Sequence, residues 1–352
     1  MILVDRRKSL LLIVFIATLF SLLLINRNSS DLRQTIIEGP AMGTQYKIVI
    51  KSNKDINSDT IKNAVESILI NINNQMSTYQ LDSEISKFNF ANDKDRFSGI
   101  DISDHFLEVI NKSFYYYTIS EGVFDITIYP LYELWGFQNK NLLSDEPSEL
   151  EVNKSLSLIG MDKLDVKNKQ LSTNYSGLSI DVSAIAKGYT VDVIFDYLKN
   201  QDYSDFFIDI GGEIRVSSAN SNSWSIGIQE PNIDRLGEVN AKIKLSNNSI
   251  ATSGNYANFI DYLNSEIART HIINPKTGYP LEIRDGIISS ASIIAPLCVD
   301  ADALATILML FDKDEGLKLI ESLDNTEAYL IYYKSGKLHT VQSSGFNQYL
   351  YE

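Results

Sequence analysis

The spacing of apolar residues along the chain predicts alternating strands and helices. Alternation from residue 46 to 50 predicts a strand, preceded by a turn-rich entry at 39–44. Apolar residues at spacings of three and four predict helices over 58–75 and 103–120. The composition and length of residues 300–311 predict a further helix. Strands and helices that follow one another in this way indicate a mixed fold class.

Residues 178–199, near the middle of the chain, combine both patterns. Apolar and polar residues alternate from 178 to 183, which predicts a strand with one buried face. Ser183 is a good N-cap, and the spacing after it predicts a helix. At this junction the first helical turn lies beside Asp181 and Lys187, where small charged ligands can be held. The residues alone also permit a plain connection in which Asp181 and Ser183 only cap the helix.

The other segments have less regular patterns. Residues 206–216 predict a buried strand interrupted by Gly211 and Gly212, and glycines within a strand mark a bulge or a close approach. The aromatic-rich run at 122–137 is more typical of a core than of a cofactor site. The remaining predictions are short strands at 224–229 and 242–245, turn-rich segments at 249–256 and 270–280, a loop at 76–89 and a surface insertion at 138–153.

The N-terminal residues 1–30 predict a membrane anchor or a signal segment. Residues 9–25 carry no charge, follow a cluster of basic residues at 6–8, and would form a helix about 25 Å long, at the short edge of a membrane span. The following residues offer no small-x-small cleavage site, which favours an uncleaved anchor. The basic cluster should stay in the cytoplasm, so the rest of the chain would be exported.

Composition narrows the possible functions. The 352 residues can form one large or two modest domains, and the net charge of −14 argues against a nucleic-acid partner. The single cysteine, Cys298, rules out an internal disulfide and cysteine-rich metal sites, and three histidines argue against a histidine-rich cluster. Any metal should therefore be a hard ion bound by oxygen.

Two oxygen-bearing residues lie on one face of the predicted helix at 300–311. Asp302 and Thr306 are four residues apart and so share a face, where a carboxylate and a hydroxyl can bind Mg²⁺. The alternative is that Asp300 and Asp302 only complement the dipole of the first helical turn. The spacing alone does not decide between these two interpretations.

Eight short motifs occur in order over some three hundred residues. From about residue 38 to 342 the chain resembles the ApbE family, the FAD:protein FMN transferases. The motifs are AMGT (41–44), MSTYQLDSEISKFN (76–89), GVFDITIYPLYELWGF (122–137), IDVSAIAKGYTVD (180–192), GGEI (211–214), ATSGNY (251–256), HIINPKTGYP (271–280) and ADALAT (301–306).

The resemblance implies a fold and an activity. The expected fold is α+β and ApbE-like, or tunnelling-fold-like, with mixed sheets and packed helices after one N-terminal hydrophobic helix. Residues 31–352 would form the FAD-binding flavin transferase domain, with one FAD site between two halves. The implied enzyme is Mg²⁺-dependent, splits FAD, releases AMP and leaves FMN esterified through its phosphate to a Thr or Ser of another protein.

The resemblance also implies partners and a location. Acceptors of the family are subunits of membrane redox pumps and related exported flavoproteins, which carry a motif of the type Asp-x-x-Ser/Thr-Gly-Ala-Thr/Ser. The anchor would hold the protein at the inner membrane with its catalytic domain on the periplasmic side. No nucleic acid is expected as a partner.

The family's site residues can be carried over to matching positions. Mg²⁺ would be bound by the side chains of Asp302 and Thr306 and by the backbone carbonyl of Ala184. His271 is the candidate base, as the only histidine inside a matching motif, and Asp302 is the second catalytic candidate. Tyr79 would offer a stacking surface for a ring of FAD. The full set of positions expected to contact FAD is Met42, Tyr79, Val123, Phe124, Asp125, Asp181, Lys187 and Ile272.

The chain departs from the family pattern at three positions. Asn274 stands where Asp is common, and Leu81 replaces a frequent proline. Ala305 stands where some members have a second acidic ligand, which predicts more water or phosphate on the metal. Two other functions use the same residues: a hydrolase that gives free FMN and AMP, and a protein that binds FAD without chemistry.

Overall fold

The computed structural model describes residues 32–138, 145–219, 222–231, 237–255, 259–260, 269–282 and 284–351. The predicted membrane segment at 9–25 lies outside these residues, as does part of the predicted insertion at 138–153. Among the helices that are described, none is both long enough and apolar enough to span a bilayer.

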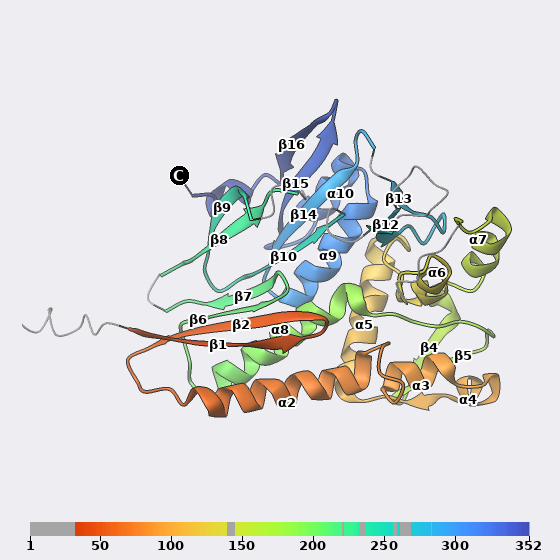
Figure 1. Ribbon diagram of the computed structural model, residues 1–352, viewed down its shortest axis with the longest axis horizontal. Helices are drawn as coiled ribbons and strands as arrows, with labels where there is room; N and C mark the ends of the chain where they lie inside the picture. Colours follow the sequence, from red (N-terminus) through yellow and green to blue (C-terminus); the bar gives the residue numbers. More distant parts are fainter. Residues whose placement is uncertain are drawn as a thin grey trace, which may run out of the picture.

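An eight-stranded sheet forms the centre of the molecule (Figure 1). Its order is β1-β2-β6-β7-β10-β14-β15-β16, and all neighbouring strands are antiparallel. Every residue of β14 is buried, because other elements cover both faces of the sheet at this strand. The strands are β1 (Arg33–Ala41), β2 (Thr44–Ser52), β6 (Phe206–Ile210), β7 (Glu213–Ser217), β10 (Ser249–Gly254), β14 (Ile288–Ala295), β15 (Glu327–Lys334) and β16 (Lys337–Gln342).

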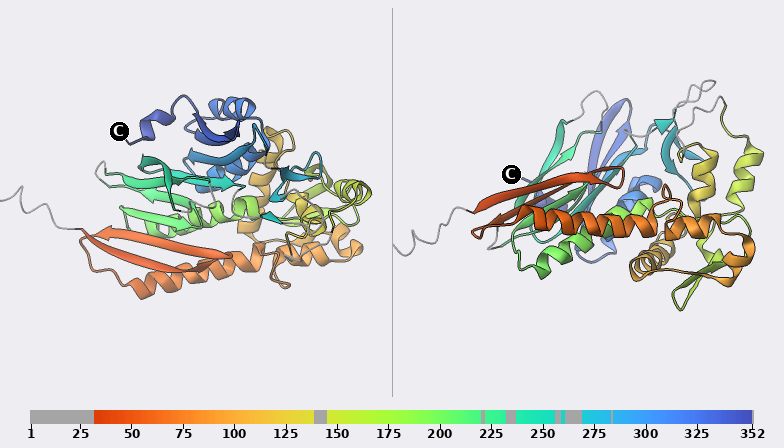
Figure 2. Two further views of the ribbon diagram at one scale, coloured as in Figure 1. Left: turned by 45° about the horizontal axis from the view of Figure 1, so that its top comes forward. Right: turned by 60° about the horizontal axis from the view of Figure 1, so that its bottom comes forward.

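Helices cover one face of this sheet. Helix α8 (Ser183–Asn200) packs on β6 and β7, and α9 (Cys298–Leu310) packs beside it on β10 and β14. Helix α2 (Ser58–Met76) runs alongside β1 and packs against α8 (Figure 2). The other helices on this side or outside the sheet, within the described residues, are α3 (Glu84–Phe90), α4 (Asp93–Ser98), α5 (Asp104–Ile119), η1 (Ile126–Ile128), α6 (Tyr129–Leu134), α7 (Glu149–Leu156), η2 (Met161–Lys163) and α10 (Lys313–Glu321).

The second face of the sheet is covered by a hairpin and the C-terminal turn. Strands β8 (Trp224–Gln229) and β9 (Val239–Leu245) form this hairpin, and η4 (Phe346–Tyr349) completes a separate apolar core with them. Two small antiparallel sheets lie outside the central sheet. They consist of β3 (Ile100–Asp101), β5 (Gln170–Thr173) and β4 (Leu164–Lys167), and of β11 (Phe259–Ile260), β12 (Arg269–Ile273) and β13 (Pro280–Glu282).

The fold class and the main elements agree with the sequence predictions. The fold is α+β, and the strand at 46–50 and the helices at 58–75, 103–120, 183–199 and 300–311 are all present as β2, α2, α5, α8 and α9. The aromatic run at 122–137 contributes Phe124, Tyr129 and Trp135 to the buried core. The expected mixed sheets are instead antiparallel throughout the described residues.

The strand predicted at 178–182 was wrong. This segment is largely buried, but it pairs with no neighbouring strand among the described residues. The side-chain amide of Asn89 takes the place of one: its Oδ1 accepts from Ile180 N at 2.7 Å, and its Nδ2 donates to Ile180 O at 2.8 Å. Arg96 Nη1 donates to Leu178 O at 2.7 Å. The alternation of buried residues is therefore real, but side chains and not a neighbouring strand provide the hydrogen-bond partners of the backbone groups.

Four further local predictions need correction. Gly211 and Gly212 form the turn of the β6–β7 hairpin, with φ of 63° and 105°, and do not interrupt a single strand. The turn-rich segments at 249–256 and 270–280 contain the strands β10 and β12, and the loop at 76–89 contains most of helix α3. The small and polar residues of these segments suggested turns. The strands and the helix form there because of packing against neighbouring elements, which local propensity does not report.

Candidate functional site

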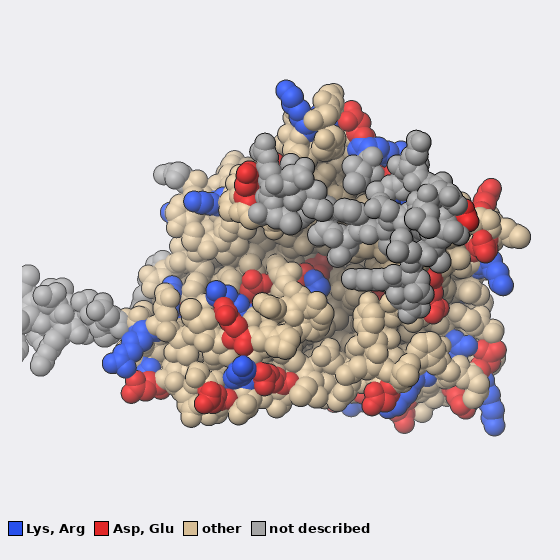
Figure 3. Space-filling view, viewed as in Figure 1, with Lys and Arg blue, Asp and Glu red and all other residues tan. Residues whose placement is uncertain are grey.

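A cavity of about 760 Å³ lies between helices α8 and α9 and the β1–β2 and β6–β7 turns, at the ends of the central strands. This volume is in the range of about 300–1,000 Å³ typical of small-molecule and cofactor pockets. Figure 3, in the same view as Figure 1, shows a hollow near the centre of the visible face, where acidic and basic side chains are interspersed. The cavity lining includes all twelve residues selected from the sequence: Met42, Tyr79, Val123, Phe124, Asp125, Asp181, Ala184, Lys187, His271, Ile272, Asp302 and Thr306.

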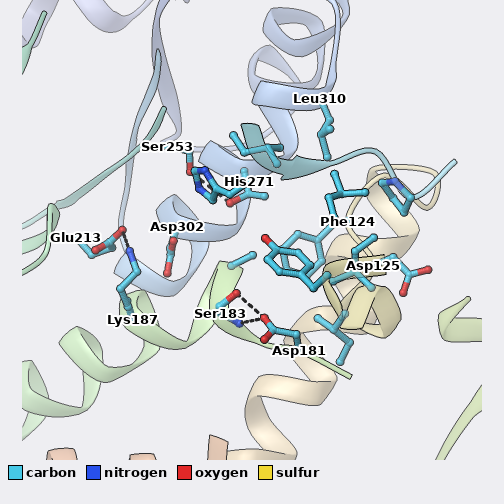
Figure 4. Close-up of a pocket in the computed structure, with 18 of the residues that line it drawn as sticks. Phe124, Asp125, Asp181, Ser183, Lys187, Glu213, Ser253, His271, Asp302 and Leu310 are labelled. Atoms are coloured by element: carbon cyan, nitrogen blue, oxygen red, sulfur yellow. Dashed lines mark hydrogen bonds and ion pairs between the residues drawn. The ribbon is translucent and has the colours of Figure 1, made fainter. Parts of the chain in front are cut away.

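The two ends of the cavity differ in character (Figure 4). Lys187, Glu213 and Asp302 lie on one side of the view, whereas Phe124 and Leu310 lie on the other. We call the first the polar end, formed by Ala184, Lys187, Glu213, Ser253, Asp302 and Thr306. We call the second the apolar end, formed by Tyr79, Phe124, Ile128, Tyr132 and Leu310.

Close packing of α8 against α9 builds the polar end. Gly188 makes it possible, because a Cβ at this position would lie 2.4 Å from the carbonyl oxygen of Cys298 and 2.7 Å from Cβ of Asp302. The Gly188 N–H donates to Asp302 Oδ2 at 2.8 Å. The helix that carries Ala184 and Lys187 is thus joined directly to the helix that carries Asp302.

A second carboxylate fixes the same pair of helices. Asp192 of α8 accepts hydrogen bonds from the N–H groups of Cys298 and Val299, each at 2.9 Å, at the N-terminus of α9. Arg215 of β7 donates to Asp192 Oδ1 at 2.7 Å. These bonds satisfy backbone donors that a helix N-terminus leaves unpaired, so Asp192 sets how α9 begins relative to α8.

Charged groups at the polar end are buried together. Lys187 pairs with Glu213 Oε1, and the Glu213 side chain is only 3% exposed. Burial raises the pKa of the Glu213 carboxyl, and the Lys187 ammonium opposes that rise. Burial also raises the pKa of Asp302, which Lys187 and the Gly188 N–H lower. Lys187 is therefore the cation that makes two buried carboxyl groups tolerable in one small space.

The predicted Mg²⁺ ligands meet in this cavity. Asp302 offers a carboxylate, Thr306 a hydroxyl and Ala184 a backbone carbonyl, and oxygen donors of these kinds suit Mg²⁺ when water and phosphate complete its shell. The Thr306 hydroxyl lies 3.3 Å from the Ser253 hydroxyl. Within the described residues, no group of three or more His, Cys, Asp or Glu side chains could hold a metal. The residues present fit Mg²⁺ with one acidic ligand, and this role stays a prediction.

Asp181 lies between the two ends, at the start of α8. Its Oδ1 accepts from the N–H of Ser183 at 2.8 Å and from the Ser183 hydroxyl, and Thr78 lies 3.5 Å from Oδ2. The Asp181 N–H donates to Ile126 O at 2.7 Å. Burial raises the pKa of Asp181, although the bonds from Ser183 and Thr78 lower it. The predicted N-cap at Ser183 was wrong: Val182 is the N-cap of α8 and makes no side-chain cap hydrogen bond, whereas Asp181, one residue earlier, accepts from the N–H of the first helical residue.

The apolar end is built mainly from loops and short helices. Val123, Phe124 and Asp125 precede η1, where Asp125 Oδ1 accepts from Thr127 N at 2.8 Å. Tyr79 lies in the turn before α3 and is 75% exposed, so its ring is free to cover a ligand. Apolar walls with one exposed aromatic ring suit a flat ring system.

Met42 occupies a strained turn at the cavity wall. It lies with Gly43 at the tip of the β1–β2 hairpin, and its φ of 47° is rarely adopted by residues other than glycine. Its sulfur lies 3.4 Å from the Thr190 hydroxyl of α8, which donates to Ala186 O at 2.7 Å. A non-glycine residue held in this conformation at a cavity is a frequent sign of a functional position.

His271 and Ile272 enter the cavity from strand β12. The structure therefore brings the base candidate into the same cavity as the Mg²⁺ candidates, and the chemical roles of all these residues stay predictions. Sequence reasoning gave no role to Glu213 or Ser253, although both lie in matched motifs. A carboxylate that directly follows two glycines in an otherwise apolar run was the signal for Glu213.

The chain is similar to proteins of one family over most of its length. The model of the ApbE family matches residues 42–330, which include every cavity residue named above. FAD:protein FMN transferase from Vibrio cholerae is 33% identical over 311 residues, or 88% of this chain and 90% of that protein. The protein of the same name from Haemophilus influenzae is 31% identical over 320 residues, or 89% of this chain and 90% of that protein.

Solved structures show the same similarity. The flavin transferase ApbE from Vibrio cholerae superposes with a TM-score of 0.80 at 31% identity, covering 91% of this chain and 100% of the other. The Pseudomonas stutzeri flavinyl transferase ApbE in its apo form gives a TM-score of 0.79 at 26% identity, covering 90% and 96%.

Proposed function

The chain belongs to the ApbE family, and we propose that it is an FAD:protein FMN transferase. In the proposed reaction a Thr or Ser hydroxyl of an acceptor flavoprotein attacks the FMN phosphate of FAD. A phosphoester bond forms, the bond to AMP breaks, and AMP leaves. The observation that carries this proposal is that one cavity joins an apolar end, suited to a flat ring system, to a polar end with phosphate-binding chemistry.

Each end of the cavity has its own task in this proposal. The apolar end holds a ring system of FAD, with Tyr79 stacked on it. Asp181 contacts FAD between the two ends, and at the polar end the half-buried ammonium of Lys187 attracts the pyrophosphate. Ala184, Asp302 and Thr306 hold Mg²⁺, which when bound neutralises charge on the phosphate oxygens. Transfer then depends mainly on placing the hydroxyl in line with the phosphate.

The acceptor hydroxyl must lose its proton as the new bond forms. We assign this proton to His271, which lines the same cavity and whose residue type exchanges protons near neutral pH. His271→Ala should slow transfer strongly at every pH while FAD still binds. Full transfer by this variant at all pH values would remove His271 from the role of base.

The acceptor is a second protein and not a small molecule. The proposal therefore includes flavoprotein subunits with the motif Asp-x-x-Ser/Thr-Gly-Ala-Thr/Ser. It also includes the membrane location: an N-terminal anchor in residues 1–30, with the catalytic domain on the periplasmic side of the inner membrane. If alkaline carbonate released the full-length chain from membranes, the anchor would be excluded.

Intact-protein mass spectrometry tests the activity directly. The full-length chain is incubated with FAD, Mg²⁺ and an acceptor domain that carries the motif. A mass gain of one FMN residue, absent with EDTA, would support both transfer and the need for metal. Accumulation of free FMN and AMP without a mass gain would favour the hydrolase. Intact FAD would favour a binding protein.

A pair of variants tests where the metal is bound. Asp302→Ala combined with Thr306→Ala should abolish FAD turnover, because both side-chain ligands are lost. Asp300→Ala is the matched control, since Asp300 lies on the same helix but pairs with Lys112 and does not line the cavity. Turnover that survived the double change would show that the metal binds elsewhere.

A further inference from the structure

The strand that carries His271 has an irregular ladder. Strand β12 pairs with β13 at Arg269 and at Ile273, and the register is irregular between these two positions. His271 lies inside that stretch. In this part of the described sheet a regular ladder therefore does not fix the backbone at His271, and contacts at the two ends of β12 must do so.

A buried tryptophan holds the end of β12 that follows His271. Trp135 is fully buried, and its Nε1 donates to Gly278 O at 2.8 Å, in the turn between β12 and β13. The centroid of its ring lies 5.6 Å from that of Tyr279. Trp135 also belongs to the same apolar cluster as Ile273, so this end of the strand is fixed to the core.

A buried arginine holds the other end. The Arg269 side chain is only 7% exposed, and its Nε and Nη2 donate to the two carboxylate oxygens of Glu146, at 3.1 and 2.8 Å. Its Nη1 donates to Glu282 of β13. Two parallel bonds to Glu146 fix the guanidinium in direction as well as in distance. Glu146 precedes α7, in the segment whose composition predicted a surface insertion, so this segment holds the strand of the base candidate.

Stability alone is a weak explanation for this ion pair. The cost of removing two charges from water is about as large as their attraction, so apolar residues often replace a buried ion pair without loss of stability. A bidentate pair does provide direction, and Arg269 is two residues from His271. A base must lie within about 3 Å of the proton that it takes, so a small shift of β12 would slow transfer.

We propose that Glu146 is a positioning residue: through Arg269 it fixes strand β12 and so the place of His271 in the cavity. The proposal rests on the function proposed above, because it takes His271 as the base. Neither Glu146 nor Arg269 is among the described residues that line the cavity. Loss of Glu146 should therefore lower the rate of transfer and leave the binding of FAD unchanged.

Histidine NMR of the full-length chain tests the position directly. The chain has three histidines, so the imidazole signal of His271 can be assigned by its absence in His271→Ala. Glu146→Gln keeps the size of the side chain but places an NH₂ group opposite a guanidinium donor, which breaks the bidentate pair. The His271 signal should shift in this variant, whereas the signals of His105 and His339 should stay in place.

Two variants serve as controls. Asp300→Asn weakens an ion pair whose carboxylate is equally exposed, at 24% against 25% for Glu146, but whose partner is Lys112. Asp165→Asn removes one negative charge from an exposed position on β4. Both positions lie outside the cavity lining, so both variants should keep the wild-type His271 signal and transfer rate.

A double-mutant cycle shows whether Glu146 acts through His271. At saturating FAD, Glu146→Gln should lower the rate of FMN transfer about tenfold or more, with the dissociation constant of FAD within about twofold of wild type. In the His271→Ala background the same change should have almost no further effect, because the group that Glu146 positions is absent. A general structural defect would lower the rate by the same factor in both backgrounds.

Three results would overturn the proposal: an unshifted His271 signal in Glu146→Gln, a transfer rate within about twofold of Asp300→Asn, or an equal fall in both backgrounds. Wild-type transfer by His271→Ala would overturn it too, since His271 would not be the base. Failure of the wild-type chain to transfer FMN would refute the function itself, whereas the NMR comparison would still report whether Glu146 sets the position of His271. If Glu146→Gln does not fold, Arg269→Lys gives the same test, because lysine keeps the charge but cannot form the bidentate pair.

Discussion

The two ends of the cavity are built in different ways. At the polar end, Ala184, Lys187, Asp302 and Thr306 lie on two long helices that pack in the core. At the apolar end, Tyr79 and Phe124 lie on turns, and Tyr79 is largely exposed. Groups that must be placed accurately for chemistry thus depend on the core, whereas groups that cover a ring system do not. Changes at the polar end should lower both stability and activity, and changes at the apolar end should mainly lower affinity.

Gly188→Ala should have the largest effect. The new methyl group would overlap the Cys298 carbonyl oxygen at 2.4 Å, and a backbone atom between two packed helices cannot move aside. We expect the free energy of unfolding to fall by about 3 kcal/mol or more, with loss of FMN transfer. Urea unfolding and the mass assay measure the two effects.

Gly316→Ala is the matched control for this variant. Gly316 is also helical, in α10, but its nearest neighbour is the flexible side chain of Leu308, at 3.2 Å from the added Cβ. The control should lose less than about 1 kcal/mol, because alanine favours helix and Leu308 can adjust. Equal losses in the two variants would mean that the close approach of α8 and α9 is not special.

Asn89→Asp should weaken the hydrogen bonds that hold residues 178–182, the segment that carries Asp181, in place. At neutral pH a carboxylate at position 89 would face the Ile180 carbonyl, to which the amide now donates at 2.8 Å. We expect a loss of about 3 kcal/mol and weaker FAD binding through displacement of Asp181. At low pH the protonated carboxyl group of this variant could donate again, so the defect should shrink as pH falls.

The pH dependence is the decisive measurement for Asn89→Asp. Unfolding and FAD binding are compared at about pH 5 and pH 7.5 against Asn153→Asp, an exposed asparagine on α7. A defect of equal size at both pH values would show that Asn89 acts by packing and not through its two hydrogen bonds to Ile180.

The features that could be predicted from the sequence are those whose signal lies within one segment of the chain. Helical spacing identified α2, α5 and α8, and composition with length identified α9, because these signals are contained in one segment. The alternation at 178–182 was equally clear but did not mean a strand, since its partner is the Asn89 side chain, about ninety positions earlier. Motif matching identified twelve cavity residues, yet it gave no role to Glu213, whose burial beside Lys187 depends on the packing of β7 against α8.

Asp192, which links α8 to the N-terminus of α9, should make the stability of the protein depend on pH. Burial raises its pKa to about 6 from its ordinary value of 3.8, although Arg215 and two N–H groups lower it. The folded protein then keeps a proton that the unfolded chain has already lost. The stability contributed by this carboxyl is present below about pH 4 and is lost as pH rises through 6, by about 1–3 kcal/mol.

Asp192→Asn removes this titration. The difference in unfolding free energy between wild type and variant should decrease from pH 4 to pH 7, whereas Asp165→Asn should follow the wild type. A difference that increases with pH would mean that the charged Asp192–Arg215 pair stabilises the fold, opposite in sign to the effect of burial.

Met42 differs from both groups of residues, because it lies on a turn yet contacts helix α8 through Thr190. The β15–β16 turn provides an internal match: Ser335 and Gly336 have φ of 52° and 76°, close to the 47° and 78° of Met42 and Gly43. Asparagine suits this turn position better than either residue, by up to about 1 kcal/mol. Ser335→Asn should therefore stabilise the protein slightly and leave FAD affinity unchanged.

Met42→Asn should separate strain from function. It relieves the same backbone conformation but removes a half-buried side chain, so unfolding free energy should stay within about 1 kcal/mol of wild type. FAD affinity should nevertheless fall about threefold or more, since the lost side chain lines the cavity. Fluorescence titration and urea unfolding of the two turn variants measure this contrast. If Met42→Asn binds FAD as well as Ser335→Asn does, neither the strained backbone nor the side chain of Met42 contributes to FAD binding.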